Sequence, residues 1–134
     1  MFKKIDHIGV AVKNLETLGS FFEEKVGIKL SEPEVVEEQK VKAAFIKIGE
    51  SKIELMESTS PEGAIGKFIE KKGEGFQHIA FSVTNIEEKL AQLKEKGVQL
   101  IDQTPRIGAG GKKIAFLHPK STSGILVELC EGEE

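Results

Sequence analysis

The stretch IDHIGVAV, Ile5–Val12, returns later in the chain as FQHIAFSV, Phe76–Val83. Each copy is followed by the same short pattern of an Asn, an apolar residue and a Glu. A second matched pair comes further along each copy, Ile53-Glu54-Leu55 in the first and Val127-Glu128-Leu129 in the second. The duplication therefore supplies two histidines and two glutamates at equivalent positions: His7, Glu54, His78 and Glu128. Two imidazoles and two carboxylates are a ligand set that suits a divalent catalytic metal.

The length and composition indicate one domain and exclude several classes of partner. With 134 residues the chain has the length of a single domain. No apolar run approaches the roughly 20 residues of a membrane span, and no signal-peptide pattern opens the chain, so we expect a cytoplasmic protein with no membrane partner. The net charge of -3 is mild and charges of both signs are mixed, which argues against nucleic acid. The single cysteine, Cys130, is expected to be a small strand residue rather than a reactive thiol.

The first copy has the pattern of a strand, a helix and three more strands. Residues 5–12 alternate as a strand does, with His7 on the face that carries small residues. Asn14 is a good N-cap for a helix whose apolar residues keep helical spacing until Gly27. Further strands are expected over residues 28–37, 41–48 and 52–57.

The second copy repeats this plan after a connecting helix. Ser60 as N-cap and Pro61 as the first helical residue predict that helix over about 61–72. Asn85 and Glu88 predict a capping box at the start of the next helix, which ends near Gly97. Strands are expected around His78 and over residues 98–103, 113–118 and 125–130, and the acidic end, Glu131 to Glu134, is expected to be frayed.

The order of elements predicts an α+β fold of two β-α-β-β-β modules in a single domain, residues 1–134. The first half spans about residues 5–57 and the second about 76–130. One module alone is too small for a good core, so we expect the two to fold as one body around a shared metal-binding cavity.

Strand alternation predicts the direction of the Glu54 side chain, and the repeated set favours a metal site. Glu54 lies between Ile53 and Leu55 and therefore faces away from both. A lone histidine or glutamate in a strand is usually structural, but the repeated set favours a metal site, because a buried carboxylate needs a cation or a proton. The set holds no thiolate, which argues against a structural zinc site, and mixed nitrogen and oxygen donors suit six-coordinate cobalt, manganese, nickel, iron or zinc.

The paired modules with His and Glu at these positions resemble the vicinal oxygen chelate superfamily over essentially the whole chain. Its members include glyoxalase I, extradiol dioxygenases, antibiotic-resistance proteins and methylmalonyl-CoA epimerases. Several stretches are most similar to the epimerases: the two His-bearing strands, the Gly-rich loop Pro105–Lys112 (PRIGAGGK), Ile114–Lys120 (IAFLHPK) and Gly124–Leu129 (GILVEL).

The resemblance implies a metal-dependent epimerase that interconverts (2R)- and (2S)-methylmalonyl-CoA. The reaction would remove and return the alpha proton through a metal-stabilised enolate. The resemblance also implies a homodimer and cobalt(II) as the expected ion, with manganese, nickel, iron or zinc as alternatives. The implied metal ligands are His7, Glu54, His78 and Glu128, of which Glu128 would also serve as a catalytic acid/base.

The chain departs from part of the family at the second catalytic base. Some of these epimerases carry a non-ligand glutamate in the strand that here reads Val41–Phe45, and they carry Gln at the position of Glu54. No carboxylate occupies Val41–Phe45 in this chain. We therefore hypothesise that Glu54, across the metal from Glu128, acts as the second base.

The Gly-rich loop has two interpretations. It is either a flexible hairpin connection or a substrate-binding loop whose glycines let backbone amides approach an anionic substrate. Its position in the best-matching stretch favours the second, so the predicted substrate contacts are Gly108, Gly110, Gly111 and Lys120. His118, before a proline, is expected to be structural or substrate-facing rather than a metal ligand.

Two other functions compete with the epimerase. Glyoxalase I (lactoylglutathione lyase) shares the fold and the same His/Glu/His/Glu set, but it needs groups for the glutathione carboxylates, and Arg106 is the only arginine here. A non-catalytic drug-binding protein would line its groove with aromatics, and this chain has no Trp or Tyr.

Overall fold

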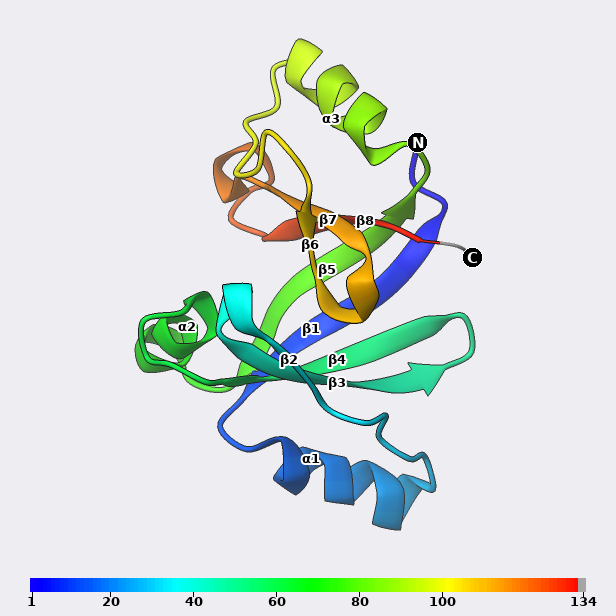
Figure 1. Ribbon diagram of the computed structural model, residues 1–134, viewed down its shortest axis with the longest axis vertical. Helices are drawn as coiled ribbons and strands as arrows, with labels where there is room; N and C mark the ends of the chain where they lie inside the picture. The colour runs from blue at the N-terminus through cyan, green and yellow to red at the C-terminus, as the bar shows by residue number, and fades with distance from the viewer. Residues whose placement is uncertain (133–134) are drawn as a thin grey trace. The chain divides into compact units, whose positions relative to one another are not determined.

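A computed structural model describes residues 1–132, and within them it confirms an α+β fold of two β-α-β-β-β modules (Figure 1). The first module consists of β1 (Lys4–Val12), α1 (Leu15–Phe21), β2 (Glu34–Val36), β3 (Val41–Ile48) and β4 (Ser51–Ser58). After α2 (Ala64–Lys72), the second consists of β5 (Gly75–Val83), α3 (Ile86–Glu95), β6 (Arg106–Ile107), β7 (Lys113–Leu117) and β8 (Val127–Glu131).

Contacts between Cα atoms divide the chain into two compact units that do not coincide with the two sequence copies. One unit consists of residues 8–77, and the other joins Met1–His7 to the chain from His78 onward. The first strand, β1, therefore contributes to both units, and His7 belongs to the same unit as the second copy.

In the unit of residues 8–77, β2, β3 and β4 form an antiparallel ladder, and the strands are ordered β2-β3-β4-β1. Figure 1 shows α1 lying against this sheet, where its Leu15 packs with Leu55 and Ile46 in one core cluster. The helix begins where predicted, because Asn14 Oδ1 accepts the Glu16 N–H at 2.7 Å. It continues through a π turn, Phe22–Val26, and ends at Gly27, whose φ is 81°.

In the other unit, the strands are ordered β5-β8-β7-β6, with β5 and β8 parallel and the remaining pairs antiparallel. The start of β1 lies beside β5, where the Lys3 N–H donates to the Ser82 carbonyl at 2.9 Å. α3 covers the sheet from one side, and its buried Ile86 and Leu90 share a core cluster with Leu129 of β8 (Figure 1).

Two predicted strands are much shorter than expected, for the same physical reason. β2 occupies only Glu34–Val36 of the predicted 28–37, because the Ser31 hydroxyl accepts the Phe45 N–H at 2.8 Å in place of a strand carbonyl. Residues 98–103 are likewise not a strand. The Asp102 carboxylate accepts the Phe116 N–H at 2.8 Å, so pairing there is limited to a bridge at Leu100.

The predicted start of α2 and the predicted capping box of α3 are also corrected. α2 begins at Ala64 with Gly63 as N-cap, because the Ser58 hydroxyl bonds both the carbonyl and the N–H of Ser60 and holds that segment in a turn. α3 begins directly after Asn85, as predicted, but the Asn85 side chain makes no capping hydrogen bond and its φ is 50°. The Ile86 N–H at the start of α3 donates to Glu131 at 3.3 Å.

The C-terminal end differs slightly from the predicted frayed tail. Glu131 is the last residue of β8, and Glu133 and Glu134 lie outside the described residues. Among the residues described, no helix is long and apolar enough to cross a bilayer.

Candidate metal centre

The two repeated histidines lie together in one unit. His7 on β1 and His78 on β5 are 4% and 2% exposed, and their Nε2 atoms are 3.1 Å apart. Their rings meet edge to face, and Phe116 of β7 packs edge-on against His78 from the second module. The duplication therefore brings the two imidazoles to one point, with equivalent nitrogens facing each other.

Glu128 joins the histidines through β8. Its Oε1 atom lies 2.9 Å from His78 Nε2 and 3.6 Å from His7 Nε2. Parallel pairing of β5 with β8 sets this position, because Glu128 is in register with Ala80, two residues after His78. Burial alone would raise the pKa of Glu128, but hydrogen bonds and charge from His7 and His78 outweigh burial and lower that pKa to about 2. Glu128 is therefore a carboxylate at neutral pH.

The separations of the three donor atoms fit a shared divalent ion. Bonds from a divalent metal to imidazole or carboxylate are about 2.1 Å long, so ligands at right angles lie roughly 3.0 Å apart and tetrahedral ligands roughly 3.4 Å apart. The observed separations are 2.9, 3.1 and 3.6 Å. All three atoms are oxygen or imidazole nitrogen donors, and all three side chains are buried. The donor set therefore suits a divalent metal.

His7 has a further partner that the sequence did not predict. The Asp6 carboxylate lies 2.8 Å from His7 Nδ1 and accepts the Ser82 hydroxyl hydrogen bond at 3.1 Å. Strict alternation puts neighbouring side chains on opposite faces of a strand, so the contact between Asp6 and His7 was not expected. The sequence did contain one signal: Asp6 alternates with the apolar residues Ile8 and Val10 on the face opposite His7. A carboxylate buried on such a face requires a partner.

Glu54 belongs to the other unit and is 7% exposed there. On β4 it is directly opposite Phe45 of β3, while its neighbours Ile53 and Leu55 pack in the α1 core on the other face. Its predicted direction, away from both neighbours, agrees with this register. Among residues 1–132 the buried carboxylates are Asp6, Glu54 and Glu128. Asp6 is bound to His7 Nδ1 and Glu128 contacts both histidines. The role of Glu54 as a metal ligand and second base stays a prediction.

The Gly-rich loop is a tight turn closed on itself. The Gly108 N–H donates to the Lys112 carbonyl at 2.8 Å, and the Gly111 N–H donates to the Gly108 carbonyl at 3.1 Å. Gly110 and Gly111 both have a φ of 74°, which explains why glycine is needed at these two positions. Since the Gly108 and Gly111 amides already bond within the loop, binding of an anionic substrate there requires other donors or a rearrangement.

Lys120 is exposed in a short 3-10 turn, Pro119–Ser121. Its backbone N–H donates to His118 Nδ1 at 3.0 Å. His118 therefore caps this turn, which agrees with a structural role for that residue. The role of Lys120 in substrate binding stays a prediction.

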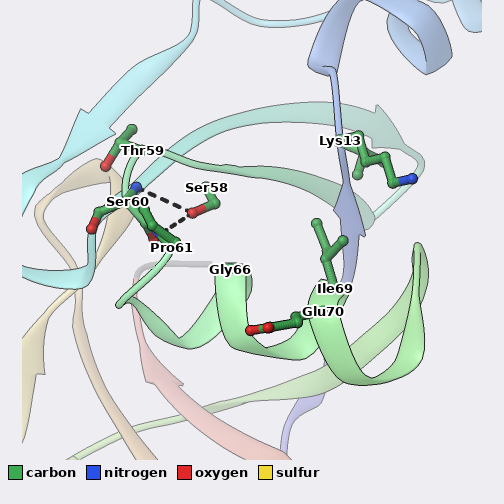
Figure 2. A pocket seen from close by; sticks show the side chains of 9 residues that line it. Lys13, Ser58, Thr59, Ser60, Pro61, Gly66, Ile69 and Glu70 are labelled. Atoms are coloured by element: carbon green, nitrogen blue, oxygen red, sulfur yellow. Dashed lines mark hydrogen bonds between the residues drawn. The ribbon is translucent and has the colours of Figure 1, made fainter.

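A pocket of about 530 Å³ lies in the unit of residues 8–77 and contains none of the predicted site residues (Figure 2). It is lined by the end of β1, the end of β4 and α2. The dashed lines in Figure 2 show the Ser58 hydroxyl bonded to Ser60, so this polar group on its wall is already satisfied.

Comparison with known proteins defines the class. Residues 6–116 match the model of the Glyoxalase/Bleomycin resistance protein/Dioxygenase superfamily. The fold of two β-α-β-β-β modules agrees with this match. The chain therefore belongs to this superfamily, also called the vicinal oxygen chelate superfamily.

Individual relatives narrow the assignment. The uncharacterized protein YqjC of Bacillus subtilis (strain 168) is 48% identical over 128 residues, which cover 96% of this chain and 91% of that protein. The mitochondrial methylmalonyl-CoA epimerase of Bos taurus is 35% identical over 127 residues, which cover 94% of this chain and 73% of that protein. A solved structure of methylmalonyl-CoA epimerase in complex with methylmalonyl-CoA and NH4+ has a TM-score of 0.94 and 38% identity, covering 98% of this chain and 96% of that one. Within the superfamily, the chain belongs to the methylmalonyl-CoA epimerase family and is an enzyme of the epimerase class.

Proposed function

We propose that the enzyme interconverts (2R)- and (2S)-methylmalonyl-CoA by removing the proton at C2 and returning it to the opposite face. The observation that carries the proposal is the convergence of His7, His78 and Glu128 on one point. The similarity to methylmalonyl-CoA epimerases supports the choice of substrate, because a relative with the same fold was solved in complex with methylmalonyl-CoA.

His7, His78 and Glu128 would hold the divalent ion, and we propose Glu54 as the fourth ligand because the duplication makes it the counterpart of Glu128. When bound, such an ion supplies Lewis acidity that stabilises negative charge developing on the thioester oxygen of the substrate. We propose cobalt(II) as the native ion and a two-fold homodimer as the assembly, in line with the family resemblance. Elemental analysis of the purified enzyme and analytical ultracentrifugation test these two points.

The proton transfers require one base on each face of the planar intermediate. Glu128 lies beside both histidines, and its carboxylate is the group placed to accept the C2 proton on one face. The electron pair of the broken C–H bond then passes into the thioester as an enolate. We propose that Glu54, which must carry a proton and leave the ion at this step, gives that proton to the other face of C2 as the enolate electron pair returns to carbon. Proton exchange with water then restores the starting states of the two glutamates, and in the reverse direction they exchange these roles.

The test is to incubate the metal-loaded enzyme with (2R)- or (2S)-methylmalonyl-CoA in deuterated water. Nuclear magnetic resonance follows deuterium at C2, and a mutase specific for one stereoisomer reports the configuration. Deuterium uptake with inversion supports the proposal. Absence of uptake by enzyme that holds a bound ion would reject it.

The same preparation tests the competing lyase activity. Glyoxalase I has the same His/Glu/His/Glu set, so the hemithioacetal of methylglyoxal and glutathione is offered under identical conditions. Thioester formation from that compound, without exchange at C2 of methylmalonyl-CoA, would transfer the assignment to glyoxalase I. An enzyme that binds no divalent ion and turns over neither substrate would instead fit a binding protein.

A further inference from the structure

We propose that Asp6 is a positioning residue for the metal centre, acting through His7 rather than on the substrate. Asp6 holds the imidazole of His7 with a proton on Nδ1, so that Nε2 faces His78 and Glu128, the other donors proposed for the ion. The inference deepens the proposed function and rests on the metal site described there.

The hydrogen bond between the two residues determines the tautomer. His7 Nδ1 and Asp6 Oδ2 are 2.8 Å apart, and both side chains are buried. A hydrogen bond of this length between an imidazole nitrogen and a carboxylate oxygen is made by an N–H donor, which places a proton of His7 on Nδ1. With the proton on Nδ1 held by Asp6, His7 would bind the ion through Nε2, the atom that lies near His78 and Glu128. An Nδ1–H bond to a carboxylate also makes the opposite nitrogen a stronger donor to a metal.

Asp6 is itself held in place by β5. Its second oxygen, Oδ1, accepts the Ser82 hydroxyl at 3.1 Å, and Ser82 is 7% exposed. Each oxygen of the Asp6 carboxylate therefore has a defined partner. Because Lys3 also bonds the Ser82 carbonyl, the segment that carries Asp6 and His7 is tied to the strand that carries His78.

The duplication does not repeat this arrangement, which makes the two histidines unequal. The residue before His78 is Gln77, and the position equivalent to Ser82 in the first copy is Ala11. Gln77 carries an uncharged amide where Asp6 carries a carboxylate. His7 is therefore the imidazole with an anionic partner from its own strand, and it should contribute more to holding the ion than its repeat equivalence with His78 implies.

The experiment measures the affinity for cobalt(II) alone, by competition with a chelating dye, in the wild-type enzyme and in Asp6→Asn. We expect Asp6→Asn to bind about 10- to 100-fold more weakly, the usual effect of removing an outer partner of a ligating histidine. Ser82→Ala should weaken binding by about fivefold, as for one lost hydrogen bond. Glu57→Gln is the matched control, because Glu57 is a part-buried carboxylate that accepts the Leu15 N–H at 2.9 Å in the other unit; its affinity should equal that of the wild type.

A second measurement reports the tautomer directly and needs no variant. Nitrogen-15 spectra of the wild-type enzyme loaded with diamagnetic zinc(II) should show His7 protonated at Nδ1 and bound to the ion through Nε2. The opposite tautomer would overturn the inference, as would Asp6→Asn binding cobalt(II) as tightly as Glu57→Gln. If Asp6→Asn fails to fold, the tautomer and the Ser82→Ala affinity decide the question. If the wild-type enzyme binds no cobalt(II), manganese(II) or zinc(II), the metal site itself is rejected. If the wild type binds cobalt(II) and Asp6→Asn and Ser82→Ala bind it equally tightly, only the role of Asp6 is rejected.

Discussion

The Nε2 atoms of His7 and His78 lie 3.1 Å apart, although 71 positions of sequence separate the two residues. They meet because the start of β1 lies beside β5, so the two copies of the duplicated strand each contribute one nitrogen. Glu128 reaches the same point from β8. The three side chains come from β1, β5 and β8 of one unit, so the register of these strands, rather than a loop, sets the distances between the donor atoms.

Removal of one imidazole should abolish tight metal binding. His78→Ala takes away a donor that lies within 3.1 Å of His7 Nε2, and we expect at least about 100-fold weaker cobalt(II) binding in a dye-competition assay. His118→Ala is the matched control, because His118 caps the exposed turn at Lys120 and lies outside the donor set. Equal cobalt(II) affinity in His78→Ala and the wild type would contradict the metal centre.

Replacement of Glu54 with Gln should separate metal binding from proton transfer. The amide oxygen remains a possible ligand, so the variant should retain its ion, but it cannot act as a base. We expect deuterium exchange starting from one stereoisomer of methylmalonyl-CoA to slow by about 100-fold or more. Nuclear magnetic resonance in deuterated water measures each isomer separately. Wild-type rates from both isomers would refute the role of Glu54 as the second base.

Cys130 should be inert in the folded enzyme. Burial raises the pKa of its thiol from 9.0 to about 12, with smaller contributions in the same direction from the charges of Asp6 and Glu128. Because only the thiolate reacts, iodoacetamide at about pH 8 should label Cys130 in urea but not in the native protein, as mass spectrometry would show. Rapid labelling of the native protein would contradict the predicted burial.

The same pKa predicts a loss of stability in alkali. The unfolded thiol ionises near pH 9 and the folded thiol near pH 12, so the stabilising contribution is complete below about pH 9 and is lost as the pH rises towards 12. Urea unfolding at a series of pH values measures this loss. Cys130→Ala should show a smaller alkaline decrease than the wild type, and an equal decrease in both proteins would exclude Cys130 as its source.

Leu129 should be essential to the core beneath the metal centre. Its side chain is fully buried against α3, and Leu129→Ala should lower the free energy of unfolding by about 2–5 kcal/mol. Ile125 is 49% exposed, so Ile125→Ala should change that free energy by less than about 0.5 kcal/mol. Urea titration of both variants gives the comparison, and similar midpoints for the two would contradict the packing described here.

The duplication predicted the module order and the grouping of His7 with His78 and Glu128, because equivalent strands of a repeat occupy equivalent places in the fold. It did not predict Asp6, because strand alternation gives only the face of a side chain and not the contacts made by a twisted strand. The placement of Glu54 relative to the other three residues remains a proposal based on its repeat position and burial.

The two strands that were predicted too long and the helix α2 that was predicted to start too early have a common cause. Side-chain oxygens accept nearby backbone N–H groups, and the apolar pattern of the sequence does not show this. Ser31 and Asp102 use side-chain oxygens to accept backbone N–H groups of β3 and β7. Backbone pairing of the predicted 28–33 and 98–103 is therefore reduced to isolated bonds, such as those from the Ser31 and Ile101 N–H groups. Ser58 acts similarly on Ser60 and delays the start of α2. Apolar patterning identifies which segments face the core, but local competition for backbone donors decides where each ladder stops.

The assignment of Met1–His7 to the unit that begins again at His78 has a consequence for synthesis of the protein. As the nascent chain leaves the ribosome, residues 8–77 emerge early and can pack as a unit while translation continues. Residues 1–7 must wait for β5 and β8, which are completed after residues 8–77, and Glu128 emerges later than either histidine. The donor atoms of His7 and Glu128 can therefore meet only after residue 128 has left the ribosome, so a chain cut before β8 would carry His7 without one of the proposed ligands.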